Sequence, residues 1–195
     1  LGLKSMPSIA EEIRLERDIA ILAYTGGRLH IPAISTKKSV EIIKKAKADG
    51  LHVTCSVAVH NICYTTEKLR SFNTNFKVYP PLRDEEDRLA VIAGLRSGTI
   101  DMVSSMHYPR TPEEKNCEFE QAELGSLGLE SCLGMLLNEF NVNEAVDFLT
   151  RGKAVFQISQ PSIEEKETAA LTCFDMAEKH KLKAESLISS VKNSM

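Results

Sequence analysis

The chain has 195 residues, of which 43% are hydrophobic and 26% are charged, and its net charge is −3. This length suits one good-sized domain or part of a larger one, and the composition is that of an ordinary globular protein. The small negative charge gives no reason to expect a nucleic acid or an acidic membrane as a partner. No apolar run approaches the roughly 18 residues that a membrane-spanning helix needs.

The cysteines are widely spread, with no Cys-x-x-Cys pair, at Cys55, Cys63, Cys117, Cys132 and Cys173. Zinc ligands usually come in close pairs, so this spacing favours reduced thiols in a cytoplasmic protein over a zinc site. The chain starts at Leu1 rather than at a methionine and stops abruptly at Met195. We therefore expect a fragment, a processed chain or the ordered part of a longer protein.

A first helix is predicted over residues 7–26. Pro7 and Ser8 form its start signal, and Glu11 is placed for a capping box with Ser8. The apolar positions with roughly helical spacing are Ile9, Ile13, Ile19 and Leu22. Gly26 and Gly27 are expected to end the helix.

Strands and helices then alternate with short loops. The predicted strands are 28–35, 51–59, 75–83 and 99–105, and the predicted helices between them are 35–50 and 83–98. Ser35 or Thr36 caps the helix 35–50, whose apolar face is Val40, Ile43 and Ala46. This alternation is typical of parallel strands with outer helices, in which the loops after the strands gather on one side. We predict an α/β fold with parallel strands between about Arg28 and Met106, forming only part of a (β/α)₈ barrel, since a whole barrel needs about 250 residues.

The pattern changes beyond Arg110. Residues 111–131 read as a long polar loop, and residues 128–140 and 141–152 as helices. Residues 167–175 read as a strand of a small β element outside the barrel.

A loop that follows a buried strand, such as the one after residues 99–105, is a common place for catalytic residues. The first side chain of this loop that could act is Met106, whose thioether cannot transfer a proton. Arg110 in this loop could hold an anion bidentately, or it could pair with Glu113 or Glu114. His52 and His60 lie on or just after one strand and could form a pair of metal ligands. A role in packing or hydrogen bonding is favoured for these histidines. The basic helix 35–50 is interpreted as a solvated face rather than a phosphate site, and Cys63 as a structural thiol.

Several segments carry a resemblance to a known family. They are "RLHIPAISTKKSVEIIKKAKADGLHVTCSV", "NFKVYPPLRDEEDRLAVIAGLRSGTIDMV", "HYPRTPEEKNCEFE" and "GSLGLES". In this order they resemble the C-terminal half of dihydroorotase, of the amidohydrolase superfamily. The resemblance implies a TIM-type (β/α)₈ barrel with a metal site at the carboxyl ends of its strands, and a small β-sandwich. Residues 1–160 would belong to the barrel, and residues 161–195 to part of the β-sandwich subdomain and a tail.

The resemblance also implies a degenerate active site. The family's metal-binding histidine in a "His-Val-Ser-Thr" run is Ala33 here, and the substrate-binding asparagine before "Pro-Pro-Leu-Arg" is Tyr79. The catalytic, metal-binding aspartate of "Asp-His-Ala-Pro-His" is Met106, and the final histidine of that motif is Arg110. His107 matches a retained histidine, for which we expect mainly a structural role. Tyr79, His107 and Arg110 are thus substrate-pocket positions by resemblance.

Two functions remain open. The first is a non-catalytic dihydroorotase-like subunit with no cofactor, since alanine offers zinc no lone pair and methionine poorly replaces a carboxylate. By resemblance, its partners would be a second copy of the chain and aspartate carbamoyltransferase, in pyrimidine biosynthesis. The second is an active zinc-dependent hydrolase of cyclic amides with an altered site. In both cases we expect the missing barrel half to come from more of the same polypeptide or from another chain.

Overall fold

The computed structural model describes residues 6–157. The chain divides into two units, Leu1–Phe156 and Gln157–Met195, and only the first is considered below. The predicted strand 167–175 and subdomain 161–195 lie outside the described residues. The strands are β1 (Leu29–Ile34), β2 (Val53–Ala58) and β3 (Met102–Ser104). The helices are α1 (Ser8–Thr25), α2 (Lys37–Ala48), α3 (Val59–Cys63), η1 (Thr66–Ser71), η2 (Thr74–Phe76), α4 (Glu85–Arg96), α5 (Pro112–Lys115), α6 (Cys132–Leu136), α7 (Val142–Thr150) and α8 (Gly152–Val155).

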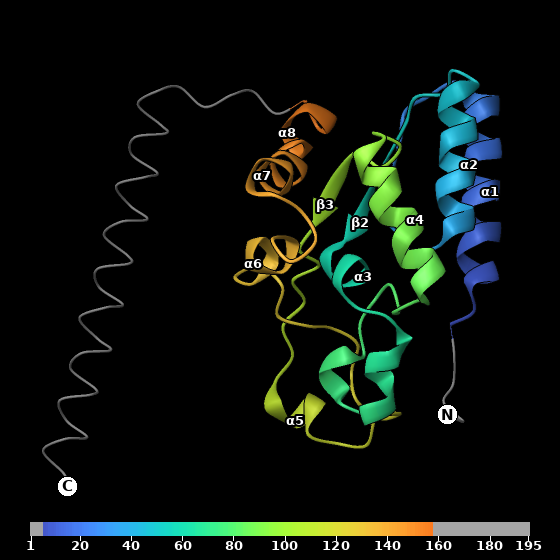
Figure 1. The fold of residues 1–195 in the computed structure, drawn as a ribbon. Coiled ribbons are helices and arrows are strands. Elements are labelled where there is room, and N and C mark those ends of the chain that lie inside the picture. Colours follow the sequence, from blue (N-terminus) through green and yellow to red (C-terminus); the bar gives the residue numbers. More distant parts are fainter. Residues whose placement is uncertain (1–5, 158–195) are drawn as a thin grey trace, which may run out of the picture. The chain divides into compact units, whose positions relative to one another are not determined.

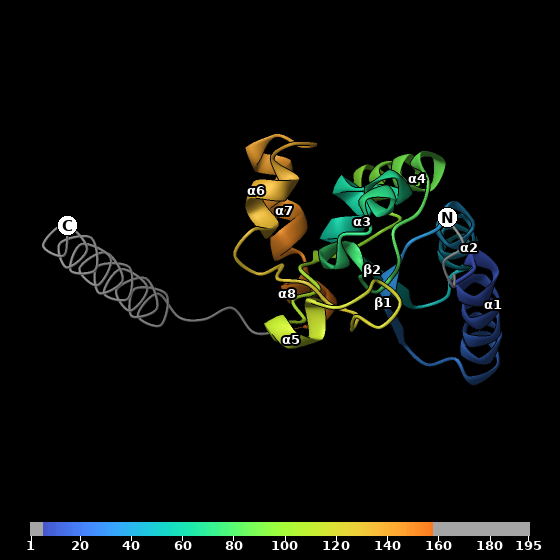
Figure 2. The same cartoon turned by 90° about the horizontal axis from the view of Figure 1, so that it is seen from below.

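The sheet consists of three strands in the order β1-β2-β3. Both pairings are parallel, with a register irregularity between Ile31 and Ile34 in β1. Helices α1, α2 and α4 form a row along one side of the sheet (Figures 1 and 2). The central strand β2 is almost wholly buried, as expected for a parallel strand that is covered on both faces. The predicted arrangement of parallel strands with outer helices is confirmed, and the sheet forms part of a barrel.

The predicted strand at 75–83 is wrong. This segment begins in η2 and continues as irregular backbone without joining the sheet. Pro80 and Pro81 have no N–H to donate to a neighbouring strand. Their carbonyl groups instead contact α3, the Pro80 oxygen lying 3.0 Å from Nε2 of His60 and the Pro81 oxygen accepting from Nδ2 of Asn61 at 2.8 Å.

The helix α1 begins and packs differently from the prediction. Pro7 is its N-cap and makes no side-chain capping bond, so the expected capping box is absent. Leu15 and Leu22 are buried, whereas Ile9 and Ile13 are 58% and 59% exposed. The helix ends as predicted, because Gly26 adopts φ 68° and its N–H reaches the carbonyl of Leu22.

The helices α2 and α4 supply much of the core. Thr36 caps α2 by accepting from the N–H of Ser39, which selects one of the two predicted caps. Ile43 and Ala46 are buried as predicted. The largest fully buried side chains include Ile34, Ile43, Ile62, Leu95, Ile100 and Leu136.

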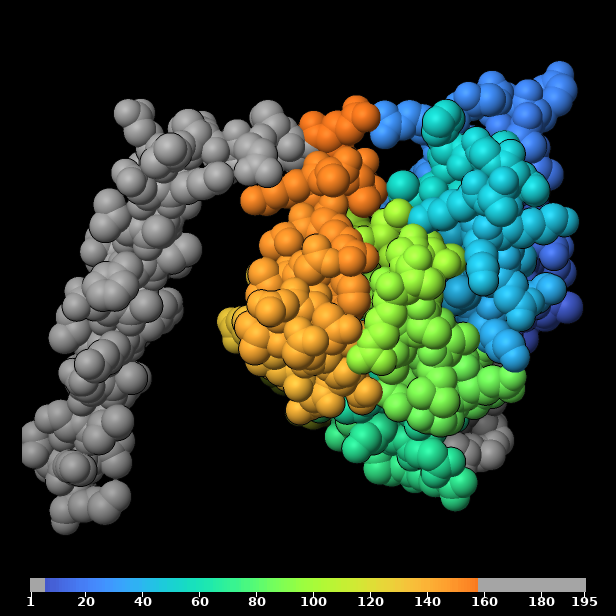
Figure 3. All heavy atoms as spheres, turned by 45° about the horizontal axis from the view of Figure 1, so that its top comes forward, coloured from blue at the N-terminus to red at the C-terminus, as the bar shows by residue number. Residues whose placement is uncertain are grey.

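The segment after Arg110 is divided into more and shorter helices than the sequence pattern indicated. The short helix α5 lies within the predicted loop 111–131, and Thr111 and Glu114 form its capping box. The predicted helix 128–140 shortens to Cys132–Leu136, and α3 begins at Val59, where a strand end was expected. Figure 3 shows α2, α4 and the α6–α8 segment forming a continuous surface on one side of the unit. Among the described residues, no helix combines the length and apolarity that a membrane crossing requires.

Candidate functional site

The carboxyl ends of the three strands place the candidate residues on one side of the sheet. Ala33 lies near the end of β1, His60 follows β2 in α3, and Met106 follows β3. This convergence follows from the parallel order, because parallel strands all finish at the same edge.

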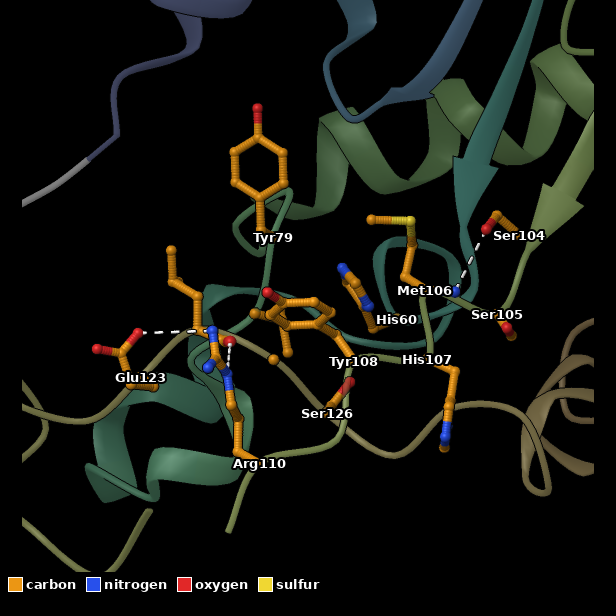
Figure 4. Close-up of a pocket in the computed structure, with 13 residues that line it drawn as sticks. His60, Tyr79, Ser104, Ser105, Met106, His107, Tyr108, Arg110, Glu123 and Ser126 are labelled. Atoms are coloured by element: carbon orange, nitrogen blue, oxygen red, sulfur yellow. Dashed lines mark hydrogen bonds and ion pairs between the residues drawn. The ribbon is translucent and has the colours of Figure 1, made fainter. Parts of the chain in front are cut away.

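Two cavities open at this edge. The first, which we call the loop cavity, has a volume of about 640 Å³ and is lined by residues that include His60, Tyr108 and Arg110 (Figure 4). The second, which we call the α1 groove, has a volume of about 590 Å³ and runs between α1 and β1. Tyr79 and Met106 line both cavities. The structure therefore brings Tyr79 and Met106, two of the positions singled out by the resemblance, together on one wall.

Met106 stands directly after β3 in a left-handed backbone conformation, with φ 44°. Its N–H donates to Oγ of Ser104 over 3.3 Å. A positive φ is uncommon outside glycine, and asparagine, aspartate and histidine adopt it far more often than methionine does. The thioether that it presents to both cavities has no proton to give and cannot accept one near neutral pH.

Ala33 and Tyr79 complete the wall shared with Met106. Ala33 is half-buried in β1 and lines the α1 groove. Its methyl group offers no ligand atom to a metal ion. Tyr79 is 51% exposed, and its ring contributes an aromatic surface where the two cavities meet.

His107 binds the loop that faces it. Its Nδ1 accepts from the N–H groups of Gly128 and Leu129, each over 3.3 Å. Gly128 is required for this approach, since a Cβ there would lie 2.0 Å from the carbonyl oxygen of Ser105. The geometry agrees with the structural role expected for His107.

Arg110 is surrounded by partners from its own and a neighbouring loop. Its Nε donates to the carbonyl of Leu124 at 2.9 Å, and its guanidinium lies 4.5 Å from the ring centre of Tyr108. Ion pairs reach Glu114 at 3.2 Å and Glu123 at 3.6 Å. The sequence offered Glu113 or Glu114 as the ion-pair partner of Arg110, and Glu114 is the one that contacts it. Glu123 was missed, because nothing local indicates that its loop folds back onto Arg110.

His60 is buried beneath the loop cavity, with 5% of its surface exposed. Its Nε2 lies 3.0 Å from the carbonyl oxygen of Pro80, whereas its Nδ1 has no partner among the described residues. Burial lowers the pKa of His60 to about 4, so the ring is neutral at pH 7. His52 is exposed and precedes β2, whereas His60 follows it. The six-residue strand between them, at about 3.3 Å per residue, holds the two imidazole rings too far apart to bind one metal ion.

Two partly buried polar contacts that sequence reasoning missed hold the walls of the site. Lys115 donates from Nζ to the carbonyls of Thr74, Lys77 and Glu123, which joins three loops. Burial lowers the pKa of Lys115. The signal in the sequence was only the charged run 113–115, which is more often a solvated surface.

The carboxylate of Glu11 forms the second contact. It accepts from the N–H and Oγ of Ser35, at 2.8 and 2.5 Å, and from Oγ of Ser39 at 2.7 Å. Arg83 approaches the same carboxylate at 3.6 Å and donates from Nε to Oγ of Ser35 at 3.0 Å. Glu11 therefore ties α1 to the end of β1 and to the segment that follows Tyr79.

The thiols of Cys55 and Cys63 are structural in character. Cys63 donates to the carbonyl of Met135 at 3.3 Å, and burial raises its pKa to about 12. Burial likewise raises the pKa of Cys55 to about 12. Such thiols are almost wholly protonated at pH 7 and therefore poor nucleophiles.

The sequence of the chain is similar to those of known dihydroorotases. The chain is 38% identical to a dihydroorotase of Caldicellulosiruptor saccharolyticus over 201 residues, which cover 100% of the chain and 47% of that protein. It is 45% identical to a dihydroorotase of Pelotomaculum thermopropionicum over 139 residues, which cover 71% of the chain and 33% of that protein. The chain thus spans about half the length of the curated relatives that it matches. No protein-family model matches it.

Solved structures with the same fold include hydantoinases. An L-hydantoinase (dihydropyrimidinase) from Arthrobacter aurescens matches with a TM-score of 0.72 and 26% identity, covering 78% of this chain and 36% of that protein. A dihydropyrimidinase from Brevibacillus agri, at 21% identity and a TM-score of 0.66 over 73% of this chain and 34% of that protein, supports the fold alone. The chain is therefore dihydroorotase-like in sequence, and its fold is a partial barrel of the amidohydrolase type.

Proposed function

We propose that this chain is part of a dihydroorotase-like protein that does not hydrolyse dihydroorotate and serves as a structural or assembly subunit. The observation that carries the proposal is that Ala33 and Met106 line the same groove. By resemblance, both positions hold metal ligands in the family, and Met106 also replaces the residue that moves protons. Loss of a general base alone commonly lowers the rate about a hundredfold to ten-thousandfold.

The described residues do not fit the zinc ion that the resemblance implies. Residues 6–157 contain no group of three or more His, Cys, Asp or Glu side chains able to hold a metal. The imidazoles that line the two cavities each have a ring nitrogen engaged. His60 has Nε2 against the carbonyl of Pro80, His107 accepts two backbone N–H groups at Nδ1, and His30 has Nδ1 against Oγ1 of Thr54. Structural zinc takes four protein ligands and catalytic zinc about three, and this part of the barrel offers no such set.

The partners are proposed on the resemblance. Inactive dihydroorotase homologues support aspartate carbamoyltransferase in a pyrimidine-synthesis complex, so we propose that enzyme and a second copy of the chain as partners in the cytoplasm. Mixing the intact protein with aspartate carbamoyltransferase from the same organism and measuring mass by light scattering tests this. Failure to form a complex at micromolar concentrations would contradict the assembly role.

The activity test uses the intact protein, assayed with dihydroorotate and added Zn²⁺ at neutral pH after removal of host enzyme. We expect no turnover and no zinc by elemental analysis. Met106→Asp alone should remain inactive, because Ala33 still lacks a ligand atom. The informative variant combines Ala33→His, Tyr79→Asn, Met106→Asp and Arg110→His. Turnover of the unmodified protein at about 1 per second or faster would favour an active hydrolase with an altered site.

A further inference from the structure

The charges that line the loop cavity balance one another. Arg110 and Glu123 are its charged lining residues, because the two histidines of the lining are neutral. Burial lowers the pKa of His60 to about 4, and Nδ1 of His107 accepts two N–H groups and therefore carries no proton. Arg110 is paired with Glu114 at 3.2 Å and with Glu123 at 3.6 Å. An anionic ligand would have to compete with two carboxylates for this arginine.

The walls of the cavity offer aromatic faces. Tyr79 and Tyr108 are 51% and 58% exposed, and they line the cavity together with the thioether of Met106 (Figure 4). A flat ring stacks on aromatic faces and packs favourably against a thioether. The cavity volume of about 640 Å³ lies within the range of about 300–1,000 Å³ that is common for small-molecule pockets. The walls therefore suit a planar ring compound.

His60 presents a hydrogen-bond acceptor that no described residue uses. The carbonyl of Pro80 can only accept, so Nε2 of His60 carries the ring proton and Nδ1 keeps a free lone pair. Nδ1 is buried without a partner, although the ring lines the cavity. A buried acceptor without a donor is unfavourable, and an N–H group of a ligand would remove that cost. The side chain of Met106 lines the same cavity and has three rotatable bonds, so it can move aside to admit the donor.

We propose that the loop cavity binds an uncharged, planar heterocycle that carries N–H and C=O groups. An N–H of the ring donates to Nδ1 of His60, and the ring stacks on Tyr79 or Tyr108. The hydroxyls of Ser104 and Ser126 also line the cavity and can donate to the ring carbonyls. The inference rests on the proposed function, since it gives a ligand to a subunit that does not hydrolyse dihydroorotate.

Glu114 and Glu123 set the selectivity of this site. Both carboxylates hold the guanidinium of Arg110, which also lies 4.5 Å from the ring centre of Tyr108. Dihydroorotate carries a carboxylate, which finds no unpaired cation among the described lining residues. The site therefore prefers an uncharged ring to the same ring with a carboxylate.

The first test compares two probes that share one ring. Orotate is uracil with an added carboxylate, which is ionised at pH 7. Binding of each probe to the intact protein is measured by isothermal titration calorimetry. We expect uracil to bind with a dissociation constant of about 1 mM or lower, and orotate to bind at least about tenfold more weakly. Nitrogen NMR of the histidine rings should show the Nδ1 resonance of His60 shifting on addition of uracil.

The second test releases the arginine. The variant is Glu114→Gln with Glu123→Gln, and glutamine at position 114 retains a capping group for α5. The matched control is Glu118→Gln with Glu120→Gln, which removes two exposed carboxylates of the same segment outside the cavity lining. We expect the affinity for orotate to rise at least about tenfold in the test variant and to stay unchanged in the control, with uracil binding equal in both.

Three results would overturn the proposal. They are orotate binding as tightly as uracil to the unmodified protein, no binding of uracil up to about 10 mM, and equal effects of the two double variants on orotate. An Nδ1 resonance that does not respond to bound uracil would remove His60 from the site. None of these measurements depends on zinc or on hydrolysis. A protein that hydrolyses dihydroorotate and still prefers uracil to orotate would contradict the proposed function alone.

Discussion

His60 should make the stability of this protein depend on pH in a narrow range. The perturbation is His60→Gln, which keeps a neutral donor for the carbonyl of Pro80 and removes the titrating ring. In the folded protein, burial lowers the pKa of His60 from 6.5 to about 4. The cause is visible in the contacts, because Nδ1, where the second proton would bind, is buried without a partner among the described residues.

The sign and size follow from linkage. Between pH 6.5 and 4, the unfolded His60 binds a proton that the folded His60 does not, so the free energy of unfolding rises with pH across this range. The contribution is fully present above pH 6.5 and is lost as the pH falls to about 4. A difference of about 2.5 pKa units at about 1.4 kcal/mol each corresponds to about 3 kcal/mol.

The assay is urea denaturation of the intact protein and of His60→Gln, from pH 4 to 7.5. Circular dichroism is the suitable probe because the chain has no tryptophan. Carboxylates titrate in both proteins, so the informative quantity is the difference between the two unfolding free energies. That difference should change by about 3 kcal/mol between pH 7 and 4. Parallel curves for the two proteins would refute the reasoning and would mean that the folded ring can accept a proton.

Three further predictions concern packing and polar contacts. Gly128→Ala should detach the loop at 125–129 and speed its amide hydrogen exchange, whereas Gly134→Ala, with no atom within 4 Å of the added Cβ, should leave exchange unchanged. Asp101→Ala should lower the free energy of unfolding by about 2–3 kcal/mol, since it leaves the N–H of Cys55 without its acceptor and Lys47 with the carbonyl of Gly98 alone. Its control, Glu86→Ala, breaks an exposed ion pair with Lys37 and should lower the free energy of unfolding far less in the same denaturation assay. Ile43→Ala, at a fully buried position, should cost about 2–5 kcal/mol by the same measurement.

The elements that could be predicted from the sequence were those with local signals. The cap at Thr36 and the left-handed Gly26 end their helices through contacts a few residues away. Apolar periodicity then located β1, β2 and α2, and the parallel order followed from their alternation. The shared edge that brings Ala33 and Met106 to the same side of the sheet could therefore be expected before any contact was known.

The features that could not be predicted depend on distant partners. Residues 75–83 have the composition of a strand, yet their carbonyls contact His60 and Asn61 in α3. Glu11 has the spacing of a capping box, but its partner Ser35 lies 24 residues away and offers a buried N–H and hydroxyl. Glu123 and Arg110 meet only because a loop returns across the cavity. In each case, local propensity competes with a long-range contact that the sequence pattern does not reveal.

The left-handed backbone at Met106 bears on which side chains this position can hold without strain. With φ 44°, the residue occupies a region in which methionine is strained and aspartate is comparatively common. An aspartate could therefore be accommodated at position 106 without moving the main chain and with some relief of backbone strain. The backbone at this position suits an aspartate better than a methionine. What separates the present site from a reactive one at this position is a change of side chain, and no rebuilding of the fold is needed there.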